Sequence, residues 1–179
     1  MTAQSAANDE LLVRQFKDGN SSAFNELYQR HISRVYRRVR FVVPDSDVED
    51  VTQEVFLAAL KSLPSFRGEA QFGTWLRTLT NHKVAEYYRK RNRKQAAPQT
   101  PLFEAQDRSD ENTATLMEER IALRKALRQI PDQYREVILL RFAEGLQFNE
   151  ISTLTGQTLE ATKSLFRRAI SALRNRLDE

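Results

Sequence analysis

The fold is decided by the stretch Gly145-Leu-Gln-Phe-Asn-Glu-Ile-Ser-Thr-Leu-Thr-Gly-Gln-Thr-Leu-Glu-Ala-Thr-Lys-Ser-Leu-Phe-Arg-Arg-Ala-Ile-Ser-Ala-Leu-Arg-Asn-Arg-Leu177, which predicts two helices joined by a tight turn. Gly156 can adopt the left-handed conformation that ends a first helix. The Thr158 side chain can accept a hydrogen bond from the free N–H groups that open a second helix. The stretch therefore predicts a helix-turn-helix.

The second of these helices has two contrasting faces. At about 100° per residue, its apolar stripe consists of Thr162, Phe166, Ala169, Leu173 and Leu177. The opposite face carries Lys163, Ser164, Arg167 and Arg168, and no acidic residue lies between Ala161 and Leu177. A basic helix face is usually only solvated. Here the specified turn and the missing acids favour a recognition helix that binds phosphates and guanine edges.

The composition limits what the chain can do. It has 179 residues, 40% of them hydrophobic, and no apolar run approaches the roughly 18 residues of a membrane span. The first ten residues lack the pattern of a secretion signal, so we expect a short disordered lead-in and a cytoplasmic protein with no membrane insertion. With no cysteine and only His31 and His82, we expect no metal, no cofactor and no catalytic residue.

The pattern along the chain predicts an all-α protein of two small helical domains joined by a flexible linker. The N-terminal domain takes residues 1–94. Its helices are predicted over 9–17, from a Ser21 or Ser22 cap until Pro44, from 45 onward, and from Trp75 after a Thr74 cap. Residues 95–115 lack periodicity and form the linker. Residues 116–179 form a four-helix domain that ends in the helix-turn-helix.

The third predicted helix has an acidic outer face. Val48, Val51, Val55 and Ala59 form its buried stripe. The far side carries four residues of a different kind, three polar and one apolar: Asp50, Gln53, Glu54 and Leu57. This face is either a partner surface or a solvated face with one exposed leucine, and the pattern alone does not decide between them.

A second basic region follows a loop with exposed aromatic residues. The loop 64–73 holds Phe66 and Phe72, and loops of this kind can hold unstacked bases. The next helix begins with Trp75, which by itself fits a core position, and it continues into the basic run 89–94. The linker after it is acidic, so it is either a plain tether or a mimic of nucleic acid in a basic channel.

Short motifs in both halves of the chain form one ordered set. Those in the first half are Gly19-Asn-Ser-Ser-Ala-Phe-Asn-Glu-Leu-Tyr28, Asp47-Val-Glu-Asp-Val-Thr-Gln-Glu-Val-Phe-Leu57, Phe66-Arg-Gly and Phe72-Gly-Thr-Trp-Leu76. Those in the second half are Ile130-Pro, Arg135-Glu-Val-Ile-Leu-Leu-Arg141, Glu144-Gly-Leu, Glu150-Ile and Lys163-Ser. In this order and spacing, the chain from Leu11 to Leu177 resembles the bacterial RNA polymerase sigma factors of the extracytoplasmic-function (ECF) type.

The resemblance implies partners and roles for the residues already singled out. Asp50, Gln53, Glu54 and Leu57 would dock on the β′ clamp helices of core RNA polymerase. Other implied partners are the β flap, promoter DNA and an anti-sigma factor. The linker would thread the polymerase channel toward the RNA exit.

The resemblance also implies two promoter contacts. The first domain would read the −10 element and capture a flipped base, a task that needs stacking surfaces and edge donors. Its residues would be Phe66, Arg67, Phe72, Trp75, Asn81, His82, Arg89, Lys90 and Arg91. The helix-turn-helix would read the −35 element with Thr158, Lys163, Ser164, Arg167 and Arg168.

The chain departs from the family pattern at three places. Asn81-His82 stands where Arg-Asn is frequent, which leaves open which side chain contacts the flipped base. Leu165 replaces a basic residue, so we expect one altered contact in the −35 element. Gln147 replaces a serine or threonine cap, at a cost of about 1 kcal/mol at most.

Two rival functions fit the residues less well. A stand-alone helix-turn-helix regulator would need a dimerisation surface or a sensor pocket, whereas the first half of the chain offers an acidic helix and a second basic region. An enzyme acting on nucleic acid would need clustered metal ligands. The closest acids, Asp47, Glu49 and Asp50, lie at a predicted helix start, where capping and the helix dipole explain them.

Overall fold

The computed structural model describes residues 3–96 and 111–178, and within these ranges it contains only helical elements. They divide into two compact units, Met1–Lys90 and Arg91–Glu179. The predicted all-α class is therefore confirmed. Most of the predicted linker, residues 97–110, lies outside the described residues.

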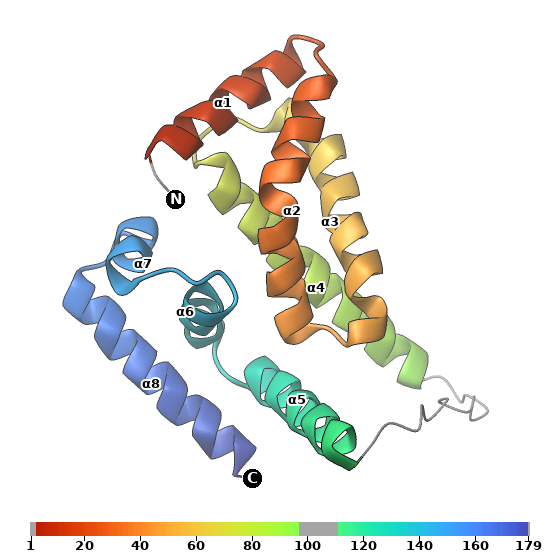
Figure 1. Ribbon diagram of the computed structural model, residues 1–179, viewed down its shortest axis with the longest axis vertical. Coiled ribbons are helices and arrows are strands. Elements are labelled where there is room, and N and C mark those ends of the chain that lie inside the picture. The colour runs from red at the N-terminus through yellow and green to blue at the C-terminus, as the bar shows by residue number, and fades with distance from the viewer. Residues whose placement is uncertain (1–2, 97–110, 179) are drawn as a thin grey trace. The chain divides into compact units, whose positions relative to one another are not determined.

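The first unit contains α1 (Ala3–Lys17), α2 (Ser22–Val42), α3 (Val48–Ser62) and most of α4 (Phe72–Ala96), whose last turns lie beyond Lys90. Short 3₁₀ turns, η1 (Asp45–Asp47) and η2 (Leu63–Ser65), lie on either side of α3. In Figure 1, α2 and α3 run side by side and α4 crosses them. The core of this unit contains Leu27, Val39, Val55, Leu63 and Leu76, each at most 2% exposed.

The second unit contains α5 (Glu111–Gln129), α6 (Asp132–Phe142), α7 (Phe148–Thr155) and α8 (Leu159–Leu177). The last helix packs against the other three. Leu127, Ile138, Leu140, Ile151 and Ala169 are almost completely buried. The core of this small unit is thus made by one helix closing over three.

Several predicted helix boundaries were wrong. The first helix begins at Ala3 rather than Asp9, so residues 3–8 are not a disordered lead-in. The helix after the linker begins at Glu111 rather than near Leu116. The fourth helix begins at Phe72, where Gln71 O accepts the N–H groups of Thr74 and Trp75, so Thr74 is not its cap.

We expected a serine side chain to cap α2, but neither Ser21 nor Ser22 does so. Ser21 makes no capping hydrogen bond, and the Asn20 side chain accepts one from Ser22 N instead, at 3.1 Å. Asparagine performs this role as well as serine. The predicted start of the helix was therefore correct, but the side chain that accepts the hydrogen bond there is that of Asn20.

No helix among the described residues is long and apolar enough to cross a membrane. The same residues hold no group of three or more histidine, cysteine or acidic side chains that could bind a metal ion.

Candidate polymerase and promoter interfaces

The helix α3 has the two faces that the sequence predicted. Val48, Val51, Val55 and Ala59 are at most 3% exposed. On the far side Asp50, Gln53 and Glu54 are exposed, and Leu57 is 49% exposed. This face therefore presents one apolar side chain to solvent beside two carboxylates.

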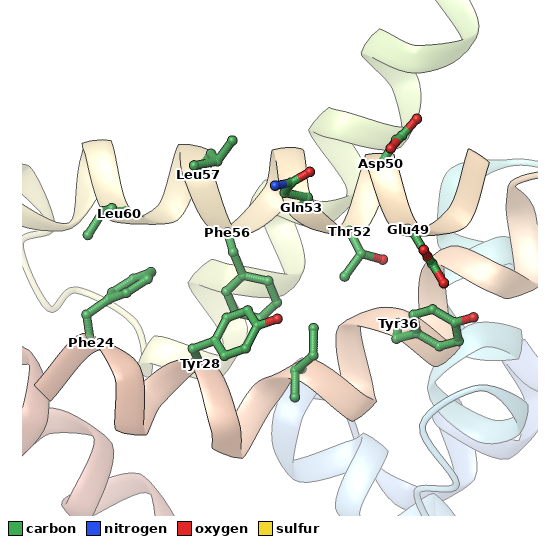
Figure 2. A pocket seen from close by; sticks show the side chains of 11 residues that line it. Phe24, Tyr28, Tyr36, Glu49, Asp50, Thr52, Gln53, Phe56, Leu57 and Leu60 are labelled. Atoms are coloured by element: carbon green, nitrogen blue, oxygen red, sulfur yellow. The ribbon is translucent and has the colours of Figure 1, made fainter. Parts of the chain in front are cut away.

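The sequence analysis missed a groove beside this face. It lies between α2 and α3, has a volume of about 540 Å³, and is shown in Figure 2. Its lining is largely aromatic and aliphatic, with a few polar residues: Phe24, Tyr28, Ile32, Tyr36, Glu49, Asp50, Thr52, Gln53, Phe56, Leu57 and Leu60.

Two observations describe the groove floor. The rings of Tyr28 and Phe56 meet edge to face, with centroids 4.7 Å apart. The Thr52 hydroxyl is buried and has no hydrogen-bond partner among the described residues. An orphaned buried hydroxyl costs free energy that a bound partner could recover. On α2, Tyr28, Ile32 and Tyr36 follow one another at intervals of four residues. This spacing places them on one face of α2, beside the buried residues of that helix.

The loop after η2 rests on an aromatic cluster. Phe66 and Trp75 are half-buried, with ring centroids 5.0 Å apart. Phe72 lies beneath them, 5.6 Å from Trp75, and is only 2% exposed. We expected Phe72 to offer its ring to a base, but in this structure it supports the two outer rings instead.

The buried Phe72 is itself held from below by α1 and α2. His31 packs edge-on against it at 5.1 Å, and His31 Nε2 lies 2.8 Å from a carboxylate oxygen of Asp9. The other Asp9 oxygen accepts from Arg30 at 3.2 Å. On the outer side, the Lys17 ammonium donates to the carbonyl oxygen of Phe66. The N-terminal helix thus buttresses the loop.

The polar residues predicted for the −10 element lie in different settings. Asn81, His82, Arg89 and Arg67 are exposed. Asn81 Oδ1 accepts two hydrogen bonds from buried Arg38, at 3.0 and 3.1 Å.

The basic end of α4 is partly neutralised. Lys90 forms an ion pair with Glu86 at 2.9 Å, and Lys83 binds the same carboxylate at 2.8 Å. The hydrogen bond from Lys83, followed by that from Lys90, lowers the pKa of Glu86 to about 2. In turn, the Glu86 hydrogen bond raises the pKa of Lys90. Arg91 is half-buried. Lys90 is therefore already paired within the helix.

The helix-turn-helix has the predicted turn. Gly156 ends α7 in the left-handed conformation, with φ of +67°. Thr158 Oγ1 accepts a hydrogen bond from Ala161 N at 3.2 Å and opens α8. At the start of α7, the Glu150 carboxylate accepts from Gln147 N at 2.8 Å. This contact satisfies a free N–H at a helix start whose predicted cap was weak.

The core side of α8 differs from the predicted stripe. Leu165 is 9% exposed and belongs to the core. Phe166 is half-buried, and its ring packs on Phe148 at 5.1 Å. Leu177, predicted to be buried, is 44% exposed. Both Leu165 and Phe166 lie on the inner side of α8, because α6 and α7 together cover more of the α8 surface than a single row of its side chains.

The outer side of α8 carries the predicted cations. Arg167 and Arg168 are exposed, and Lys163 and Ser164 are half-buried. Lys163 pairs with Glu160 at 3.0 Å, an acid that lies just before the acid-free stretch. Lys163 is therefore already partnered within the helix.

The two units together define a class of protein. Residues 27–94 match the family model for sigma-70 region 2, and residues 120–173 match that for sigma-70 region 4. The chain is 32% identical, over 181 residues and 94% of each chain, to the ECF RNA polymerase sigma-E factor of Escherichia coli strain K12. It is 30% identical to the ECF RNA polymerase sigma factor BldN of Streptomyces coelicolor, over 90% of this chain and 63% of that one.

A solved structure agrees with this assignment. CnrH, in complex with the cytosolic domain of CnrY, is 26% identical, with a TM-score of 0.61 over 96% of this chain and 97% of that one. The protein is thus of the sigma-70 class. Within that class, the chain belongs to the ECF RNA polymerase sigma factors. It is a non-enzymatic initiation factor that directs RNA polymerase to promoters.

Proposed function

We propose that this sigma factor docks on the β′ clamp helices of core RNA polymerase through the exposed face of α3 and the groove beside it. The observation that carries this proposal is an apolar groove beside exposed Leu57, rimmed by the carboxylates of Glu49 and Asp50. Such a surface suits a helix with apolar and basic side chains.

The first unit reads the −10 element and traps one base from the non-template strand. The half-buried rings of Phe66 and Trp75 offer stacking surface at a fixed position, because Phe72 and α1 support them. His82 lies two helical turns beyond Trp75 on the same side of α4, and Asn81 precedes it. These two exposed side chains supply hydrogen-bonding groups for the edge of the base. Arg67, Arg89, Lys90 and Arg91 bind the strand's phosphates.

The second unit reads the −35 element through α8. Its N-terminal turns, with Lys163 and Ser164, meet the base edges, while Arg167 and Arg168 bind phosphates and fix the register. Thr158 contributes through its backbone, since its hydroxyl caps the helix. The exposed apolar residues of this unit, Leu116, Met117, Ile121 and Phe142, give it surface for the β flap.

We also infer an anti-sigma partner. The similar protein CnrH was solved in complex with the cytosolic domain of CnrY. A segment that fills the groove between α2 and α3 would compete with polymerase for the same residues. Such competition would keep the sigma factor inactive.

Run-off transcription with bacterial core polymerase on a pool of promoter fragments tests the docking face. The test variant is Asp50→Arg, Leu57→Ala. The chain offers a matched control in Glu10→Arg, Leu11→Ala, which changes an exposed acid and an exposed leucine on α1. We expect the test variant to lose most specific initiation and most affinity for core polymerase, and the control to retain both. Equal behaviour of the two variants would remove the α3 face from the proposal.

A further inference from the structure

An acidic residue lies on the face of α8 that is proposed to read the −35 element. Glu160, Ser164 and Arg167 follow one another at intervals of four and three residues, so they lie along one face of the helix. The opposite face carries the buried residues Thr162, Leu165, Ala169 and Leu173. An arrangement that brings Ser164 and Arg167 to a duplex therefore brings Glu160 there as well.

Glu160 lies at the end of this face that would enter the major groove. It is the second residue of α8, after the Thr158 cap, and its side chain is 78% exposed. In helix-turn-helix proteins, the N-terminal residues of the recognition helix contact base edges. Glu160 Oε1 lies 3.0 Å from the Nζ of Lys163, about one turn further along the helix. The reading end of α8 thus presents a carboxylate and an ammonium group side by side.

A carboxylate in a DNA groove is favourable only opposite a hydrogen-bond donor. The phosphates carry negative charge, so an acid that finds no donor weakens binding. Acidic side chains accept from cytosine N4, and lysine donates to guanine O6 or N7. In a G·C pair N4 and O6 lie next to each other, because they are hydrogen-bonded to one another. In an A·T pair the donor, adenine N6, lies between two acceptors that repel a carboxylate.

We propose that Glu160 is a specificity-determining residue that accepts a hydrogen bond from cytosine N4 at one position of the −35 element, while Lys163 donates to the guanine of the same pair. The inference rests on the proposed reading of the −35 element by α8. It adds an acidic residue to a helix face that otherwise binds through donors, and it specifies the base pair. At that pair both charges gain a base partner in exchange for their ion pair.

The test uses full-length protein assembled with bacterial core polymerase. Holoenzyme selects fragments from promoter DNA whose −35 segment is randomised, and the retained fragments are sequenced. Glu160→Ala removes the carboxylate, and Glu160→Gln replaces it by an amide. Asp178→Asn is the matched control, because it removes one negative charge from an exposed acid at the other end of the same helix. Lys163→Met and Ser164→Ala test the reading by α8 itself.

We expect one position of the −35 segment to respond to both Glu160 variants. In Glu160→Ala, the preference for cytosine there should fall by about tenfold, the discrimination that one good base contact supplies. In Glu160→Gln, the preference should shift toward adenine, whose N6 and N7 suit an amide. Lys163→Met should weaken the preference at the same position, and Asp178→Asn should leave every preference unchanged.

The outcomes separate this inference from the proposed function. If none of the variants at Glu160, Lys163 and Ser164 changes a base preference, α8 does not read the −35 element, and both fail. If Lys163→Met or Ser164→Ala changes a position while both Glu160 variants keep the wild-type preferences, the reading by α8 stands and the role of Glu160 is refuted.

A purely electrostatic Glu160 would give a different result. Glu160→Ala would then raise the affinity for all sequences equally and change no preference, which also refutes the inference. The same holds if the position that responds prefers an A·T pair in the wild type, or if Asp178→Asn alters that position as strongly as Glu160→Gln.

Discussion

At the scale of single residues, Asp9 shows how far the first unit depends on buried polar contacts. It is 1% exposed and contacts His31 and Arg30 from a helix outside the residues that match the region 2 model. It therefore joins α1 to the part of the molecule that matches sigma-70 region 2.

Replacing Asp9 by alanine should lower the stability of the first unit by about 3 kcal/mol, because both partners lose a buried acceptor. Urea unfolding followed by the fluorescence of Trp75, the single tryptophan, measures the change. Glu10→Ala, next to it but exposed, is the control and should change stability by less than about 0.5 kcal/mol. Equal effects of the two changes would mean that the Asp9 contacts are not stabilising.

Glu86 makes a second prediction possible, because its pKa is lowered from 4.5 to about 2 by Lys83 and Lys90. A carboxylate with a lowered folded-state pKa stabilises the fold above pH 4.5, and this contribution disappears as the pH falls from 4.5 toward 2. NMR titration of the Glu86 carboxyl group measures the pKa directly. In Lys83→Met, which removes the largest cause, it should rise toward 4.5. Lys61→Met, on α3, is the matched control and should leave it unchanged.

At the scale of elements, the turn between α7 and α8 depends on one backbone conformation. Gly156 has φ of +67°, and a Cβ placed there would meet no atom within 4 Å. Gly156→Ala should therefore destabilise the second unit by about 1 kcal/mol through backbone strain alone. Gly156→Asn should cost less, since asparagine tolerates this conformation better. Thermal unfolding of the two variants gives the comparison. A larger loss in the Asn variant would show that side-chain contact, rather than backbone strain, limits this position.

The elements also show what could be predicted from the sequence. The turn at Gly156, the Thr158 cap and the buried stripe of α3 follow from local rules of geometry and hydrogen bonding, and the structure confirms them. Burial of Phe72 and Leu165 depends on how many helices cover a face. One helix's periodicity cannot supply this information.

The groove between α2 and α3 was unpredictable for a related reason. In the sequence, Tyr28, Ile32 and Tyr36 have the spacing of an apolar helix face. Whether such side chains fill a core or line a groove depends on the distance between two helices, which the sequence pattern does not give. The contact between Arg38 and Asn81 was equally unpredictable, because the two residues lie on different helices.

At the scale of the whole molecule, promoter affinity should be salt-dependent through phosphate contacts made by both units. Removing two such contacts with Arg167→Ala, Arg168→Ala should reduce the slope of log affinity against log salt concentration by about 2. Holoenzyme binding to promoter DNA at several salt concentrations measures the slope. The control is Arg174→Ala, Arg176→Ala, in the last turn of the same helix. An unchanged slope in the test variant, or an equal fall in the control, would contradict the assignment of these contacts.

The ion pair between Glu160 and Lys163 has a consequence for how the molecule searches a chromosome. The two charges cancel in the first turns of α8, so a distant duplex attracts the helix through Arg167 and Arg168 instead. Where Lys163 meets a base edge, that contact competes with the ion pair to Glu160. On the proposed −35 assignment, we therefore expect random sequence to hold the N-terminal turns of α8 weakly and residence on wrong sites to be short. Glu160 would thus favour rapid dissociation from every site except the one where base contacts replace its ion pair with Lys163.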